Sequence, residues 1–391
     1  MVLAAGPLDM SEAITPFALA IAEETLADLR ARLARTRWPE RETVADWSQG
    51  VPLASIRALC DYWARDYDWR RCEARLNALG QYHTRIDGLR IHFLHVRSRN
   101  PDAAPLILTH GWPGSVVEFL DVIGPLTDPL AHGGDAADAF HVVVPSLPGF
   151  GYSDKPTTTG WGVERIAAAW ISLMKRLGYS RFFAQGGDWG AAVTTAIGAL
   201  APPECAGVHL NFPLIYPEPA DLAQLTEAER AAVAAMKFYR RSDSAYAQLQ
   251  RTRPQTLAYG LTDSPAAQAA WIYEKFYAWT DHRGEPESAL SRDAMLDNIM
   301  LYWLPATAAA SARLYWESLA SFRSQPLSLP VGVTIYPGEF SRPSRRWAER
   351  HFSNIIHWNE TDRGGHFAAF EQPDLFVADL RDCFRGLRLG T

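Results

Sequence analysis

The sequence predicts an α/β fold: a mostly parallel, doubly wound sheet with an inserted helical cap and an N-terminal wrapping extension. Three observations support this prediction. Residues 105–109 and 140–144 are continuous apolar runs, which are typical of parallel strands covered on both faces. Residues 185–190 form a glycine-rich corner between a short strand and a helix. Residues 213–325 read as helices only, and strand-like residues return at 331–336.

Length and composition limit the classes of function. At 391 residues and 48% hydrophobic, the chain can bury a large core. A net charge of -6 argues against nucleic acid or an anionic membrane as a partner. The N-terminus lacks a signal peptide, and no apolar run approaches the ~20 residues that span a bilayer. The four cysteines show no metal-ligand spacing, so we interpret the protein as cytoplasmic with reduced thiols.

Residues 1–80 are predicted to form the N-terminal extension. A short strand through Phe17 and Ile21 leads into an amphipathic helix that ends before Pro39. A second helical region, rich in aromatic residues, follows at 47–75. Its apolar faces need a partner, so we expect the extension to wrap the main body. It carries no residues with evident chemistry.

Residues 81–212 are predicted to form the first part of the core. Residues 82–86 and 89–96 alternate between apolar and polar around Asp87-Gly88, a strong hairpin signal. The strands at 105–109 and 140–144 then add parallel neighbours. The result is a sheet with a β-hairpin beside its parallel part.

The corner Gln185-Gly186-Gly187-Asp188-Trp189-Gly190 has the pattern of a nucleophile elbow, small-x-nucleophile-x-small. This element identifies the expected architecture as the α/β-hydrolase fold, with a carboxylate where an esterase carries serine. A carboxylate can displace a leaving group from saturated carbon and form an ester with the enzyme. The alternative is an ordinary glycine-rich turn whose aspartate caps the helix.

The loop His110-Gly111-Trp112-Pro113-Gly114-Ser115 follows a predicted parallel strand next to the elbow strand. Such a loop can aim a backbone N–H group at the reacting centre. We expect the N–H groups of Trp112 and Trp189 to form an oxyanion hole, and both tryptophans to line the substrate pocket. His110 is interpreted as a residue that fixes the loop. An ordinary turn is the alternative.

Residues 213–325 are predicted to form a helical cap over the active face. Helices are expected at 227–240, 266–280 and 292–320, and the segment holds eight of the fourteen tyrosines of the chain. A cap inserted at this position would enclose Asp188 in a dry, apolar chamber.

Residues 326–391 are predicted to complete the core. Glu339 follows the strand at 331–336, and His366 follows a strand at 354–358 and precedes a helix opened by Pro373. The chain order Asp188, Glu339, His366 is that of the α/β-hydrolase triad. Three further acids compete with Glu339 for the role of orienting the histidine; they are Glu349, Glu360 and Asp362.

On these motifs the sequence resembles the microsomal-type epoxide hydrolases. The similarity rests on residues 110–115, 186–190, 298–303 and 363–371 and extends from about residue 15 to the end. The resemblance implies an N-terminal meander, an α/β-hydrolase core and a helical cap. It also implies a soluble, bacterial-like member, because the sequence shows no transmembrane anchor.

The resemblance further implies roles for single residues. Asp188 is expected to be the nucleophile, His366 the base that activates water, and Glu339 the acid that orients the base. Two cap tyrosines, Tyr315 and Tyr246, are expected to hold the epoxide oxygen and protonate it as the ring opens.

The predicted activity is hydrolysis of a small apolar epoxide to a vicinal diol, without a metal or an organic cofactor. One alternative is a haloalkane dehalogenase, which shares the aspartate elbow and the tryptophan after it. Another is a non-catalytic ligand-binding protein on the same fold. The sequence is compatible with a homo-oligomer and with a role in either detoxification or biosynthesis.

Overall fold

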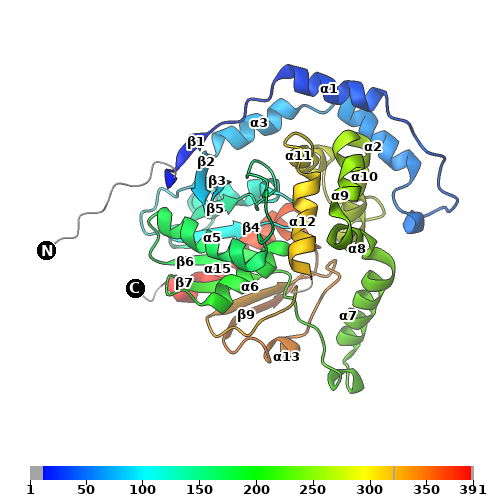
Figure 1. Cartoon of the computed structure of the whole chain (residues 1–391). Coiled ribbons are helices and arrows are strands. Elements are labelled where there is room, and N and C mark those ends of the chain that lie inside the picture. Colours follow the sequence, from blue (N-terminus) through cyan, green and yellow to red (C-terminus); the bar gives the residue numbers. More distant parts are fainter. Residues whose placement is uncertain (1–11, 320–321, 389–391) are drawn as a thin grey trace.

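A nine-stranded sheet forms the centre of the protein in the computed structural model, which describes residues 12–319 and 322–388 (Figure 1). The strands lie in the order β1-β2-β3-β5-β4-β6-β7-β8-β9. Their bounds are β1 Thr15–Phe17, β2 Gln81–Ile86, β3 Leu89–Val96, β4 Ala104–Thr109, β5 Phe140–Pro145, β6 Phe182–Gly186, β7 Cys205–Leu210, β8 Val331–Ile335 and β9 Ile355–Glu360. The pairings from β5 through β9 are parallel, and those from β1 through β3 to β5 are antiparallel. The predicted α/β-hydrolase architecture is therefore confirmed.

The antiparallel edge agrees with the predicted hairpin, with one difference at β1. Asp87 and Gly88 adopt φ angles of 49° and 81°, as a tight two-residue hairpin turn requires. The strand predicted through Ile21 ends at Phe17. Beyond it, the N–H of Ile21 donates to a carboxylate oxygen of Glu73 (2.7 Å), so side chains replace the strand partner.

Four helices flank the parallel part of the sheet; they are α4 Leu120–Thr127, α5 Val163–Arg176, α6 Trp189–Leu200 and α15 Pro373–Arg388. Helices α5 and α6 pack together, and α4 packs on α15. Every residue of β5 and β6 is buried between these layers. The continuous apolar runs of the sequence thus lie in strands whose two faces are both covered.

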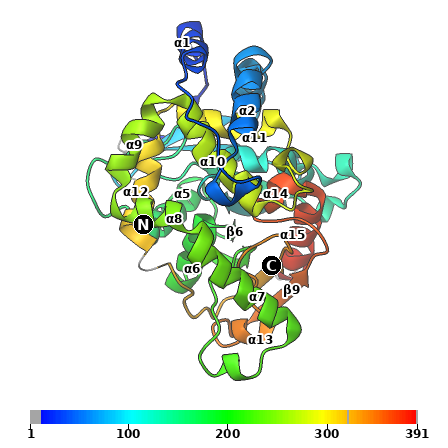
Figure 2. The ribbon, with the colours of Figure 1, turned by 90° about the vertical axis from the view of Figure 1, so that its right-hand side faces the viewer.

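The N-terminal helices are α1 Glu23–Ala34, α2 Leu53–Arg65 and α3 Trp69–Ala78, drawn in blue in Figure 1. They contact the cap: α1 and α2 pack on α10 (Figure 2), and α3 packs on α11 (Figure 1). Tyr67 and Arg71 both bind the carboxylate of Asp297 in α11, at 2.7 and 2.8 Å. The predicted helical region at 47–75 is broken before α3, because Asp68 caps the new helix by accepting the N–H of Arg70.

The segment between β7 and β8 is helical, as predicted. Its α-helices are α7 Glu227–Phe238, α8 Ala245–Thr252, α9 Pro254–Asp263, α10 Pro265–Trp279, α11 Arg292–Trp303 and α12 Ala308–Ser318, with a π-helical turn at Tyr239–Asp243. The single helix predicted at 292–320 is wrong: it is two helices, and its predicted last residue lies outside the described residues. Pro305 cannot continue the helical hydrogen bonding, and Ala306 has a φ of 52°. Helices α13 (Arg345–Ala348) and α14 (Ala368–Glu371) complete the core.

Over residues 12–319 and 322–388, none of these helices combines the length and the apolar character that crossing a bilayer requires.

Candidate active site

Asp188 occupies the sharp turn between β6 and α6. Its φ of 50° and ψ of -127° are strained for a residue with a side chain, which is the expected backbone of a nucleophile elbow. A side chain at Gly190 would overlap the carbonyl oxygen of Thr109, so only glycine permits this close approach of helix and strand. The Asp188 side chain makes no capping hydrogen bond to α6. The side chain therefore does not cap the helix, which was the alternative interpretation. It points into the site.

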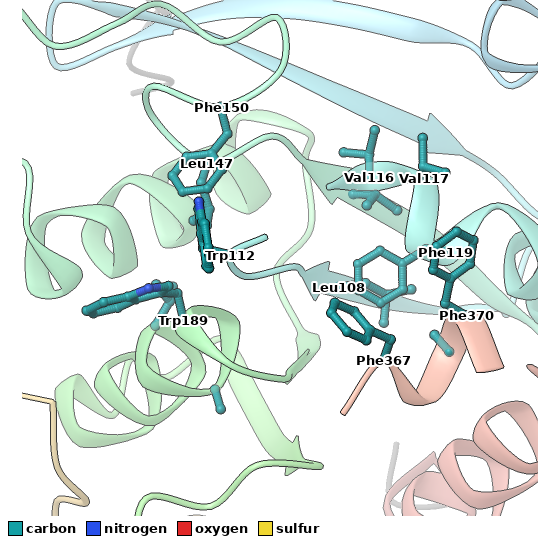
Figure 3. Packing of buried hydrophobic residues seen from close by; sticks show 14 of the residues in the cluster. Leu108, Trp112, Val116, Val117, Phe119, Leu147, Phe150, Trp189, Phe367 and Phe370 are labelled. Carbon is teal, nitrogen blue, oxygen red and sulfur yellow. The ribbon is translucent and has the colours of Figure 1, made fainter. Parts of the chain in front are cut away.

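The loop after β4 contacts the Asp188 carboxylate directly. The backbone N–H of Trp112 donates to Asp188 Oδ1 at 2.8 Å. Trp189 is the first residue of α6, so its N–H has no acceptor within the helix. Figure 3 shows the two indole rings, one from the loop and one from the helix start. Both predicted oxyanion-hole residues therefore flank Asp188.

His110 fixes this loop, as predicted. It is buried; its Nδ1 lies 2.9 Å from the Gly111 carbonyl oxygen, and its Nε2 accepts the N–H of Leu147 at 3.2 Å. Burial lowers the pKa of His110 to about 4, so its imidazole is neutral near pH 7.

His366 lies between two carboxylates. Its Nδ1 is 2.7 Å from Glu339 Oε2, and its Nε2 is 3.4 Å from Asp188 Oδ2. The other oxygen of Glu339 accepts the N–H of Phe340 at 2.8 Å, which fixes the carboxylate. The three competing acids, Glu349, Glu360 and Asp362, are all exposed to solvent. Glu339 therefore contacts His366, and none of the three competing acids does.

The surroundings of His366 favour its charged form. Burial opposes a charge on the imidazole, but the charges and hydrogen bonds of Glu339 and Asp188 outweigh it and raise the pKa of His366 well above the usual value. Neutralising Asp188 would remove part of this effect. The basicity of His366 therefore depends on the state of Asp188.

Tyr246 and Tyr315 lie opposite Asp188, in α8 and α12 of the cap. The Tyr246 ring stacks on Trp112 with centroids 4.9 Å apart, and the Tyr315 ring meets Trp189 edge-on at 4.8 Å. Burial, together with the nearby Asp188 charge, raises the pKa of both phenols well above the usual value. Both are therefore neutral O–H donors at physiological pH.

A pocket of about 260 Å³ lies between the cap and the core. Asp188, Trp189, Tyr246 and Tyr315 line it together with both apolar and polar residues of the cap and apolar residues of the core. Trp112, also predicted to line the substrate pocket, lies behind Tyr246 and borders a second, smaller cavity beside Asp188. A ligand that filled the larger pocket would contact both the carboxylate and the two phenols.

Several residues that support this site carried no predicted role. Asn298 and Tyr302, on one face of α11, donate to the carbonyl oxygens of Pro113 and Gly114, both at 2.7 Å. In the sequence, their four-residue spacing within the motif at 298–303 indicates that both side chains lie on one face of a helix. Glu371 accepts the N–H of Phe367 at 3.0 Å and that of Asp281, from the cap, at 2.7 Å.

Tyr239 also lines the pocket, and its hydroxyl lies 3.0 Å from that of Tyr246. The only indication in the sequence that Tyr239 lies near Tyr246 is their separation of seven residues, which is two helical turns. In the described ranges no group of three or more His, Cys, Asp or Glu side chains is arranged to hold a metal ion.

Comparison with known families matches two regions of the chain. Residues 14–119 match the family described as epoxide hydrolase N terminus, and residues 104–256 match the alpha/beta hydrolase fold. The first match covers the N-terminal helices and the hairpin, and extends through the loop that contacts Asp188.

Similar proteins extend the match to almost the whole chain. A protein of Stigmatella aurantiaca named "Putative epoxide hydrolase" is 60% identical over 96% of this chain and 86% of its own. Epoxide hydrolase 1 of Sus scrofa is 33% identical over 96% of this chain and 89% of its own. The crystal structure of juvenile hormone epoxide hydrolase from Bombyx mori superimposes with a TM-score of 0.88 at 30% identity, over 97% of this chain and 95% of that one. With the observed fold, these similarities show that the chain is an enzyme and belongs to the epoxide hydrolase family.

Proposed function

We propose that the enzyme converts an apolar epoxide to a vicinal diol through an ester formed on Asp188. The observation that carries this proposal is the placement of Asp188 between His366 on one side and the Tyr246–Tyr315 pair on the other. An epoxide in the pocket would meet a nucleophile on its carbon and acidic O–H groups on its oxygen.

In the first step, a carboxylate oxygen of Asp188 attacks a ring carbon and the carbon–oxygen bond of the epoxide breaks. The released oxygen takes a proton from Tyr246 or Tyr315, which leaves a tyrosinate. A phenol is a weak acid toward water but is sufficient for an alkoxide released by a strained ring. The product of this step is a hydroxyalkyl ester of Asp188.

In the second step, His366 Nε2 removes a proton from water, and the oxygen of that water adds to the carbonyl carbon of the ester. The N–H groups of Trp112 and Trp189 are placed to stabilise the resulting oxyanion. Collapse expels the diol oxygen, which takes the proton from His366. The Asp188 carboxylic acid then ionises, and its proton returns to the tyrosinate.

The charge environment supports this order of events. In the free enzyme, Asp188 and Glu339 both hold the pKa of His366 high. Esterification makes Asp188 neutral and removes one of these influences, so the pKa of His366 falls and the imidazolium releases its proton to solvent. The neutral imidazole can then accept a proton from water. Glu339 remains to orient the ring and to stabilise the imidazolium.

His366→Gln tests the proposal, because it should form the ester but not hydrolyse it. The variant is incubated separately with styrene oxide and with 1-bromobutane, and its intact mass is measured. We expect a gain of one whole epoxide on the peptide that contains Asp188, and no gain in Asp188→Asn. A gain of one butyl group with 1-bromobutane and none with styrene oxide would instead indicate a dehalogenase.

A single turnover of the wild-type enzyme in ¹⁸O-water provides a second test. If water attacks the ester carbonyl, the heavy oxygen is retained in the Asp188 carboxylate and the first diol carries none of it. Direct attack of water on the epoxide would place the label in the diol, and would contradict the ester intermediate.

A further inference from the structure

Glu118 is a carboxylic side chain at the site that the reaction described above does not use. It belongs to a 3-10 helix at Val116–Phe119, directly after the loop that contacts Asp188. Figure 3 shows its neighbours Val117 and Phe119 among the buried side chains near Phe367 and Phe370. The other three residues of this helix are apolar and buried, whereas Glu118 carries a carboxyl group and is only partly buried.

The Glu118 carboxyl folds back onto the same loop that contacts the nucleophile. A side chain at Gly114 would overlap Glu118 Oε1, just as one at Gly111 would overlap Asp188 Oδ1. The two carboxyl groups thus lie against positions three residues apart in one loop. Tyr302 fixes this part of the loop through its bond to the Gly114 carbonyl oxygen.

The charges at the site also couple Glu118 to the proposed reaction. Desolvation raises the pKa of Glu118 to about 8, while His366 acts to lower it and Asp188 acts to raise it further. In the described part of the chain, Glu118 forms no ion pair with a lysine, arginine or histidine. Glu118 is partly buried, and a carboxyl group in that position without a cationic partner costs more to desolvate than an apolar side chain in the same space. This cost argues for a role beyond packing.

A small cavity lies next to this carboxyl. Its volume is about 20 Å³, and its lining includes Glu118, Asp188, His366 and Asn211. A polar cavity of this size accommodates one water molecule, which needs two to four polar partners. Asp188 is its only lining residue that also borders the larger pocket. Water can therefore occupy this cavity while a ligand fills the larger one.

We propose that the Glu118 carboxyl binds the hydrolytic water in this cavity and holds it between His366 and the carbonyl carbon of the Asp188 ester. The inference rests on the proposed ester mechanism and adds a residue to its second step. One hydrogen of the water goes to His366 Nε2, and its oxygen bonds to the ester carbon. Glu118 keeps a hydrogen bond to this water and exchanges no proton overall. A carboxyl group can do so in either protonation state, as donor or as acceptor.

The test separates ester formation from ester hydrolysis. Glu118→Met has a similar length but cannot bind water, so hydrolysis of the ester should slow about tenfold to a hundredfold while its formation changes less than about threefold. With styrene oxide, kcat and KM should fall together and kcat/KM should stay nearly constant. Glu118→Gln, which can still bind water, should recover part of the hydrolysis rate. Rapid quenching followed by intact-mass analysis measures both steps directly.

Ala369→Val provides an independent variant, because Ala369 lines the cavity from α14 and a larger side chain there would fill it. It should slow hydrolysis with Glu118 intact. Unchanged hydrolysis in both Glu118→Met and Ala369→Val, or an equal loss in both steps, would overturn the inference. If His366→Gln forms no ester with styrene oxide, the proposed mechanism itself has failed. By contrast, normal ester formation followed by normal hydrolysis in Glu118→Met would contradict only the role of Glu118.

Discussion

The core side and the cap side of the site are held in different ways. On the core side, hydrogen bonds from backbone and side chains fix each group: Trp112 N–H on Asp188, and Glu339 on His366. On the cap side, Tyr246 and Tyr315 are held mainly by aromatic rings, with Trp112 and Trp189 as partners. In the proposed mechanism the cap side serves ring opening, and the His366–Glu339 pair serves hydrolysis. Substitutions on the two sides should therefore separate the two steps.

The largest effect is expected from Glu339→Gln. A glutamine can keep its Oε1 on the N–H of Phe340 and then presents its NH₂ group to His366 Nδ1. This arrangement places the imidazole proton on Nε2, the nitrogen that should accept a proton from water. We expect ester hydrolysis to slow about 10³-fold or more, with ester formation affected far less. Single-turnover kinetics with styrene oxide measure both rates; an equal loss in both would contradict the division between the two sides.

Removing both cap phenols is expected to have the next largest effect. Tyr246→Phe and Tyr315→Phe each keep the ring contacts and lose one O–H donor. We expect each single variant to slow ester formation about tenfold to a hundredfold, and the double variant to slow it more than either. Hydrolysis of an ester already formed should change little. The measurement is the rate at which the protein mass rises after mixing with epoxide, and a double variant no slower than the singles would contradict a shared role.

The success of the sequence predictions also differs between these two sides. Asp188, Glu339 and His366 each follow a parallel strand, and the carboxyl ends of such strands converge on one edge of the sheet. Local sequence therefore determines their meeting place. Tyr246 and Tyr315 come together only through packing of helices far apart in the chain, and their assignment depended on a family resemblance.

The predictions that were wrong or missing have two different causes, one local and one that depends on packing. The helix predicted at 292–320 splits at Pro305, a residue whose effect on a helix is local and was available in the sequence. Glu118 gave no comparable signal, because its relation to Gly114 and to the cavity exists only in the folded loop. A glutamate next to two valines reads as part of an ordinary helix. Its proposed role depends on its burial and its neighbours in the folded protein, which the local sequence does not determine.

The pH dependence should also differ between the two steps. Hydrolysis needs neutral His366, and neutral imidazole increases as pH rises through its pKa, which Glu339 still raises in the ester. Well below this pKa, the hydrolysis rate should rise about tenfold per pH unit and then level off. Ester formation should not fall toward pH 10, because the pKa values of Tyr246 and Tyr315 lie well above the usual value for tyrosine. Single-turnover rates between pH 6 and about 10 test this prediction; loss of ester formation near pH 9 would contradict it.

The smallest effect is expected from Tyr239→Phe, which tests whether the cap side also depends on a hydrogen bond. The Tyr239 hydroxyl lies 3.0 Å from that of Tyr246, and its ring stacks on Phe340 with centroids 4.2 Å apart. When Tyr246 gives up its proton, Tyr239 can donate to the resulting tyrosinate and stabilise it. Phenylalanine keeps the stacking and loses this bond, so ester formation should slow roughly threefold to tenfold, with hydrolysis unchanged. Tyr216→Phe, at the same pocket, is the matched control and should leave both rates unchanged. If Tyr239→Phe, like Tyr216→Phe, left both rates unchanged, aromatic packing alone would suffice to position the cap tyrosines.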